Sequence, residues 1–240
     1  MRYYLLLIFL LMDHMARSQS ISKRVLIFSK TLKYHHESIP DAIIAIRKLG
    51  ELHHFTVDTT TNSALFTSQI LKKYKAIIFL STSGNLLDTL QKISLKNFIE
   101  AGGGYVGIHS ASTSDKDWTW YGHLVGAVFV NHPDPQTAIV RVVDSTANAT
   151  KSLPKRWSHK DEWYNFRDIQ SDLHILLEAD ETTYTGGTNG PNHPLAWFHA
   201  YDGGRSFYTA LGHFSETYTD PLYLSHILAG IEYAIGNNKP

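Results

Sequence analysis

The sequence predicts an α/β domain with a mostly parallel, doubly wound central sheet and extra antiparallel strands in its C-terminal half. The first hundred residues alternate strand-like and helix-like segments, which is typical of parallel sheets covered by helices. Two of the strand-like segments are continuously apolar, as expected for strands that are buried on both faces. The chain has 240 residues, of which 43% are hydrophobic, so it can bury a substantial core.

The elements of the N-terminal half can be placed in order. Ser38 or Pro40 opens the first helix and Gly50 closes it, because proline favours a first turn and glycine favours a helix end. The other predicted elements are strands over 24–29, 53–58, 75–81 and 105–109 and helices over 67–73 and 88–101, the last one stopped by Gly102.

After about residue 135 the pattern changes to strands with few helices between them. Strands are predicted over 137–143, 173–178, 195–199 and 206–211, and a helix over 223–235 closes the chain. The tripeptide Asp202 to Gly204 ("DGG") predicts a hairpin between the last two strands. Because there is no linker, composition break or internal repeat, residues 21–240 are expected to form a single domain.

The N-terminus is typical of a signal peptide over residues 1–20. Arg2 precedes an apolar run over residues 3–12, and Ala16 and Ser18 form a small-residue cleavage pattern. An uncleaved anchor is the alternative, but the run is shorter than the roughly 20 residues that span a bilayer. We therefore expect export to the periplasm or the cell exterior, with no stable membrane span after cleavage.

Composition excludes several kinds of partner and cofactor. Lysine plus arginine and aspartate plus glutamate both number 22, so no net positive charge favours nucleic acid. The chain has no cysteine, which excludes thiolate sites. No phosphate loop or G-x-G-x-x-G motif follows the first strand, so no bound nucleotide is expected. The sequence does not define an oligomeric state.

Polar residues follow several predicted strands at the sheet edge where open α/β sheets bind ligands. His35 and His36 follow the first strand, and His109 ends the fourth in "GIHSA", a sharp turn similar to a nucleophile elbow. Ser110 is one residue away from the elbow position, which disfavours it as a nucleophile.

Six motifs make the chain resemble the ThuA-like family, named for trehalose utilisation. The resemblance covers about residues 24–237 and rests on "FSKTLKYHHESI", "GGGYVGIHSAS", "GAVFVNHPDPQ", "DEWYNF", "HPLAWFHAYDGGRSFYTALGHFSETY" and "HILAGIEYAIG". It implies a flavodoxin-like three-layer sandwich similar to class I glutamine amidotransferases, and a substrate among glycosides or oxidised sugars. His109 stands where those amidotransferases have a cysteine, whereas His213 and Glu216 fall where their His and Glu partners would, which argues against glutamine hydrolysis.

Histidines in the predicted site loops are candidate ligands for a divalent metal, with zinc first among them. Neutral imidazole binds zinc, nickel, copper and iron, and Glu162 is the best placed carboxylate. Because no H-E-x-x-H motif is present, a hydrogen-bonded polar network remains the alternative. The candidate metal ligands are His36, His109, His132 and His213.

Aromatic residues interleaved with polar ones favour a carbohydrate ligand, since a sugar combines an apolar face with hydroxyl groups. Core packing is the alternative for about half of these aromatics. The candidate substrate contacts are Tyr34, His35, Ser110, Trp118, Trp163, Tyr164 and His193.

Three functions are consistent with these residues. The leading hypothesis is hydrolysis or lyase-type cleavage of a glycoside or keto-glycoside, with His109, His213 and Glu162 as the catalytic residues. The second is a sugar-binding protein without catalysis, since a fold does not fix a function. The third is a serine amidohydrolase that uses Ser110.

Overall fold

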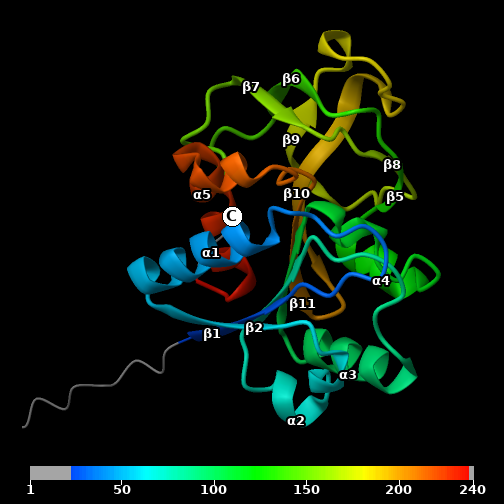
Figure 1. The fold of residues 1–240 in the computed structure, drawn as a ribbon, viewed down its shortest axis with the longest axis vertical. Coiled ribbons are helices and arrows are strands. Elements are labelled where there is room, and N and C mark those ends of the chain that lie inside the picture. Colours follow the sequence, from blue (N-terminus) through cyan, green and yellow to red (C-terminus); the bar gives the residue numbers. More distant parts are fainter. Residues whose placement is uncertain (1–22, 238–240) are drawn as a thin grey trace, which may run out of the picture.

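The computed structural model describes residues 23–237, which form two sheets and five α-helices (Figure 1). The predicted signal peptide lies outside these residues. The strands are β1 (Lys23–Phe28), β2 (Phe55–Thr60), β3 (Ala76–Leu80), β4 (Gly104–Ile108), β5 (Val128–Asn131), β6 (Gln136–Val142), β7 (Arg156–Asp161), β8 (Asn165–Arg167), β9 (His174–Ala179), β10 (His193–Tyr201) and β11 (Gly204–Thr209). The α-helices are α1 (Ile39–His53), α2 (Ser68–Leu71), α3 (Thr89–Glu100), α4 (Thr119–Val125) and α5 (Pro221–Ala234).

The main sheet has nine strands in the order β2-β1-β3-β4-β11-β10-β9-β6-β7. The pairs β2-β1, β1-β3, β3-β4 and β4-β11 are parallel. The pairs from β11 through β10, β9 and β6 to β7 are antiparallel. The predicted α/β fold, with a parallel half and antiparallel strands added in the C-terminal half, is thereby confirmed.

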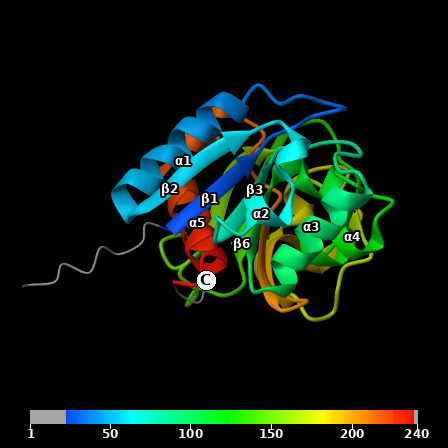
Figure 2. The same cartoon turned by 90° about the horizontal axis from the view of Figure 1, so that it is seen from below.

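Helices cover both faces of the parallel half. Figure 2 shows α1 and α5 together on one side of β1 and β3, and α2, α3 and α4 on the other. Every residue of β3 and β4 is buried, which explains their continuously apolar sequences. At Gly104 a Cβ atom would lie 2.1 Å from the carbonyl oxygen of Ala234, so only glycine allows α5 to pack this closely on β4.

The predicted hairpin forms between β10 and β11. Asp202 (φ 50°) and Gly203 (φ 88°) both adopt the left-handed conformation, which suits a two-residue turn between antiparallel strands. The hairpin returns the chain to the parallel half, because β11 pairs with β4 as well as with β10. The segment after β11 therefore ends beside the segment after β4.

Several predicted bounds were wrong. Helix α1 does not end at Gly50 but continues to His53, because His54 takes the left-handed conformation (φ 61°) and donates its N–H to the Gly50 carbonyl. As a result β2 begins at Phe55 rather than at His53. The strands β5, β7 and β8 and the helix α4 were not predicted. No helix in residues 23–237 is long and apolar enough to cross a membrane.

Candidate functional site

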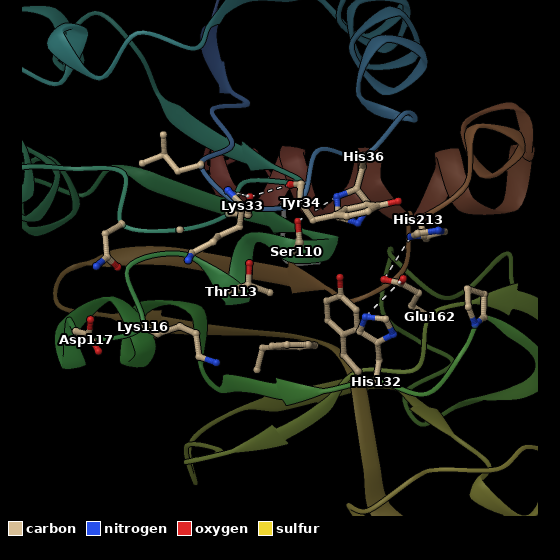
Figure 3. A pocket seen from close by; sticks show the side chains of 17 residues that line it. Lys33, Tyr34, His36, Ser110, Thr113, Lys116, Asp117, His132, Glu162 and His213 are labelled. Atoms are coloured by element: carbon tan, nitrogen blue, oxygen red, sulfur yellow. Dashed lines mark hydrogen bonds and ion pairs between the residues drawn. The ribbon is translucent and has the colours of Figure 1, made fainter.

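Four side chains from distant segments meet at the carboxyl edge of the sheet, and Figure 3 shows three of them, His36, Glu162 and His213. His36 lies between β1 and α1, and His109 directly follows β4. Glu162 directly follows β7, and His213 lies in the segment after β11. One nitrogen or oxygen atom from each lies within 4.8 Å of the corresponding atoms of the other three. We refer to these four residues as the His/Glu cluster.

The backbone and ring of His109 are fixed by the neighbouring strand. His109 is fully buried and has a φ of 53°, an uncommon conformation for a residue other than glycine, which turns the chain sharply at the end of β4. Its Nδ1 lies 2.7 Å from the carbonyl oxygen of Ala210. Because a carbonyl only accepts, Nδ1–H is the donor, and the neutral ring keeps its lone pair on Nε2.

Three groups converge on that single nitrogen. His109 Nε2 lies 3.0 Å from His36 Nε2 and 3.0 Å from the Tyr164 hydroxyl. It also lies 3.3 Å from Glu162 Oε2. One lone pair accepts one well-directed hydrogen bond, so hydrogen bonds alone do not account for all three contacts.

Burial and charge keep the imidazole of His36 neutral. Burial, together with the repulsion of a positive charge by the neighbouring His109 and His213, lowers its pKa to about 3. At neutral pH the ring therefore holds a free lone pair, as a metal ligand must.

Glu162 and His213 favour each other's charged forms. Burial opposes ionisation of Glu162, but its interactions with His109 and His213 outweigh this and hold its pKa well below the usual range. Burial also opposes protonation of His213, yet Glu162 outweighs it and raises the pKa of that ring. His213 Nδ1 lies 3.3 Å from Glu162 Oε2, but it is buried and makes no hydrogen bond within residues 23–237.

Asp161 fixes the backbone of the segments that carry Glu162 and His213. This fully buried carboxylate accepts backbone N–H bonds from Gly212 (2.8 Å), His213 (3.2 Å) and Glu162 (2.9 Å). Burial alone would raise its pKa, but hydrogen bonding to His159 and the other nearby donors lowers it. Asp161 therefore joins the end of β7 to the segment after β11 as a carboxylate.

The cluster faces a pocket of about 1020 Å³, at the upper end of the range for small-molecule sites. His132 lies on its wall, with Nε2 3.6 Å from Glu162 Oε1. Tyr34 is 62% exposed at the pocket. The Ser110 hydroxyl donates to the Thr82 carbonyl (3.1 Å) and lies 3.5 Å from His36 Nδ1.

The structure brings most of the sequence-predicted site residues together. Those that line the pocket are Tyr34, His36, Ser110, His132, Glu162, Tyr164 and His213. His109 lies directly behind them, in contact with His36 and Tyr164. Of the predicted metal ligands, His36, His109 and His213 lie in the His/Glu cluster together with Glu162, the carboxylate expected beside them, whereas His132 lies outside it.

Four predicted substrate contacts lie elsewhere. Trp163 is fully buried and donates its Nε1–H to the Gln136 carbonyl, so it cannot reach a ligand. His193 is also fully buried, between the Tyr164 carbonyl and Glu181. Trp118 stacks on Trp120 outside the pocket, with ring centroids 4.9 Å apart.

His35, the fourth, contacts the Thr31 hydroxyl through Nδ1 and does not line the pocket either. It is adjacent to His36 in the sequence, but the two side chains do not share an environment. His35 is exposed and His36 is buried.

The sequence reasoning missed three residues of this region. Asp161 is not among the predicted site residues, although its place next to Glu162 in "DEWYNF" is a usable signal. Lys33 and Lys116 also line the pocket. Lys33 lies within the motif "FSKTLKYHHESI", but nothing in the sequence around either residue distinguishes it from a surface lysine.

The comparisons with known proteins identify the family. The ThuA family, described as trehalose utilisation, matches residues 24–234. The chain therefore belongs to the ThuA family, as its motifs predicted. No protein of curated function matches the chain.

Solved structures share the fold. A putative ThuA-like protein from Bacteroides uniformis is 25% identical, with a TM-score of 0.76, over 91% of this chain and 93% of that one. A putative ThuA-like protein from Parabacteroides merdae is 19% identical, with a TM-score of 0.73, over 90% and 91% of the two chains. A β-galactosidase from Rahnella sp. R3 is 15% identical, with a TM-score of 0.56, and the match covers 91% of this chain but 32% of that one.

Proposed function

We propose that this protein is an exported enzyme that cleaves a glycoside or keto-glycoside, by hydrolysis or by a lyase reaction, with a divalent metal bound to the His/Glu cluster. The observation that carries the proposal is the convergence of three imidazoles and one carboxylate at a large pocket. The family's description, trehalose utilisation, supports a carbohydrate as substrate.

Three of the six distances between the ligand atoms of the cluster have the spacing of a metal site, and all six are within 4.8 Å. A tetrahedral site with bonds of about 2.0–2.1 Å places its ligand atoms about 3.3 Å from one another. The contacts His109 Nε2 to His36 Nε2 (3.0 Å), His109 Nε2 to Glu162 Oε2 (3.3 Å) and His213 Nδ1 to Glu162 Oε2 (3.3 Å) agree with that spacing. Three nitrogens and one oxygen are a ligand set that zinc accepts.

Two further observations fit the same ion. The buried Nδ1 of His213 has no hydrogen-bond partner in the described part of the chain, and such atoms are rare unless something else satisfies them. His109 Nε2 has three polar neighbours, whereas its one lone pair can accept only one well-directed hydrogen bond. A cation between these atoms would satisfy both nitrogens and the charge of Glu162.

A metal at this position would polarise a substrate oxygen or lower the pKa of a water molecule. The protein's own groups would orient the metal ligands. The Ala210 carbonyl orients His109, and Asp161 orients Glu162 and His213. The Tyr164 hydroxyl, 3.0 Å from His109 Nε2, reaches the same point from the pocket wall.

His132 is the best placed proton donor or acceptor outside the His/Glu cluster. Its Nδ1–H donates to the Pro133 carbonyl (2.8 Å), so Nε2 is the atom that gains or loses a proton. A proton on Nε2 would face Glu162 and the pocket at the same time. His132 can therefore serve as general acid or base, which replaces the ligand role expected from sequence.

The amidohydrolase alternative has less support. The Ser110 hydroxyl is committed to the Thr82 carbonyl, and the nearest imidazole, His36, has its pKa lowered to about 3. Such a ring is a poor base for activating a hydroxyl at neutral pH.

The test is a product screen with the purified chain. Glycosides and their keto derivatives would be incubated with enzyme loaded with zinc, nickel or manganese, and products followed by NMR. We expect turnover by the wild-type chain, loss in His109→Ala and His213→Ala, and full retention in His53→Ala, which removes an exposed histidine on α1. Saturable sugar binding without turnover would contradict an enzymatic function and favour the alternative of a sugar-binding protein without catalysis.

A further inference from the structure

Two lysine side chains line the pocket away from the His/Glu cluster. Figure 3 shows Lys33 and Lys116 on the side of the pocket opposite to His213 and Glu162. Within residues 23–237 neither ammonium forms an ion pair with a carboxylate. Lys116 Nζ lies instead over the Phe129 ring, 5.4 Å from its centroid.

The backbone holds both lysines against the segment that follows β3. On one side, Lys33 N–H donates to the Ser83 hydroxyl (3.3 Å) and Leu32 N–H to the Ser83 carbonyl (2.8 Å). On the other side, Asp115 N–H donates to the Gly84 carbonyl (3.0 Å). Three segments that follow β1, β3 and β4 are therefore joined side by side, and each of the two outer ones carries a lysine.

Gly84 lies between the two outer segments and leaves room for the lysine stem. It has a φ of 91°, and a Cβ atom there would lie 3.4 Å from Lys33 Cγ and 3.0 Å from Leu32 Cβ. The exposed Lys33 side chain therefore begins close to Gly84 and lines the wall of the pocket from there.

The nearest buried carboxylate does not neutralise these lysines. Asp115 is 1% exposed, accepts the Leu86 N–H (3.2 Å) and forms an ion pair with Lys92 at 3.1 Å. The only carboxylates among the described lining residues are Asp117 and Glu162, and Glu162 is engaged by the histidines. This side of the pocket therefore has an excess of positive charge.

We propose that Lys33 and Lys116 form an anion subsite, and that the substrate is a sugar bearing a carboxylate or a phosphate group. The inference rests on the proposed function, since it specifies the carbohydrate that the same pocket takes. The two ammonium groups would bind the anionic group, while Asp117 accepts hydrogen bonds from sugar hydroxyls. The remaining part of the sugar would then extend toward the His/Glu cluster.

Calorimetric titration of the zinc-loaded chain tests the subsite with four probes: methyl glucoside, methyl glucuronide, glucose 6-phosphate and inorganic phosphate. We expect at least one of the two anionic sugars to bind about tenfold more tightly than methyl glucoside, and the stronger of the two identifies the charged group. The double variant Lys33→Met, Lys116→Met should remove that preference and leave methyl glucoside unchanged. Its matched control, Lys48→Met, Lys73→Met, removes the same charge from exposed positions outside the pocket.

The outcomes separate this inference from the proposed function. Equal binding of all three sugars would overturn the anion subsite and leave the carbohydrate function standing. A preference that survives in the double variant would also overturn it, because the anion would then bind elsewhere, for instance at the metal. Binding of phosphate alone, lost in the double variant, would support the subsite and contradict a sugar substrate.

Discussion

His109 and His193 are both fully buried and both lie near a glutamate and a tyrosine hydroxyl, but they differ in what their ring nitrogens contact. His193 Nε2–H donates to the Tyr164 carbonyl (2.7 Å), and Nδ1 contacts Glu181 (2.7 Å) and the Tyr184 hydroxyl (3.0 Å). His109 also has one carbonyl partner, Ala210 at Nδ1, but its Nε2 faces a second imidazole, that of His36, in addition to Glu162 and the Tyr164 hydroxyl. Its Nε2 faces other potential ligands at the edge of a pocket.

This difference distinguishes structural from functional histidines better than burial does. Both nitrogens of His193 are used to hold the segment between β9 and β10. The three imidazoles of the His/Glu cluster instead direct nitrogens at one another and at Glu162, an arrangement that is unfavourable unless a proton or a cation lies between them. We therefore expect substitutions in the two regions to affect different properties.

The largest expected effect is on activity. His109→Ala should lower turnover at least a thousandfold, because it removes a ligand at the centre of the cluster, while the free energy of unfolding of the metal-free protein changes far less than the activity does. Turnover on the glycoside found in the product screen would be measured beside chemical denaturation. Activity within tenfold of wild type in a folded variant would contradict the assigned role.

The second effect is on stability. His193→Leu should lower the free energy of unfolding by about 3 kcal/mol, because it leaves the Tyr164 carbonyl and Glu181 without their buried partner. His53→Leu, at an exposed site, should change it by less than about 0.5 kcal/mol. Urea denaturation measures both. A His193 variant as stable as the control would show that this histidine is not structural.

A third substitution acts on the site through the backbone that positions the ligands. Asp161→Asn replaces one of the two acceptor oxygens by an amide NH2, opposite the N–H of either Gly212 (at Oδ2) or His213 (at Oδ1), so it should weaken zinc binding about 10–100-fold with all four ligands present. Competition with a chromogenic chelator measures the affinity. Asp134→Asn, in an exposed loop, is the control and should bind zinc like the wild type.

The smallest effect concerns His226, a fully buried histidine on α5. Burial lowers its pKa to about 4, and its Nδ1–H donates to the Ala149 carbonyl (2.9 Å). Because the unfolded chain takes up a proton near pH 6.5 and the folded chain only near pH 4, stability is unaffected above pH 6.5 and decreases as pH falls. The loss should reach about 2 kcal/mol by pH 5. Denaturation of wild type and His226→Phe at pH 7 and pH 5 tests this, and an equal loss in both would contradict it.

The sequence predicted the fold well because the relevant signals are local. Continuous apolar runs marked β1 and β3, and the Asp202 to Gly204 turn marked the hairpin that brings β11 beside β4. The end of α1 was wrongly predicted at Gly50. Glycine costs only about 1 kcal/mol inside a helix, and here it lets the helix pack close to the Phe55 carbonyl. The strand β7 was missed because its sequence, "RWSHKD", is largely polar.

The site was only partly predictable, because its residues are joined by tertiary contacts. Strand ends indicated His36 and His109, and the turn at the sheet edge explains why both lie at the pocket. The aromatic residues were less informative. Trp163 satisfies its N–H on a backbone carbonyl in the interior, and nothing in its local sequence distinguishes that from a place in the pocket wall.

The most direct test of the central claim is the metal content of the purified chain, measured by plasma mass spectrometry after incubation with zinc and gel filtration. We predict close to one zinc per chain in the wild type and in His193→Gln, and little or none in His109→Ala and Glu162→Gln. A folded wild-type chain without metal, or metal retained equally in all four proteins, would contradict a metal centre at the His/Glu cluster.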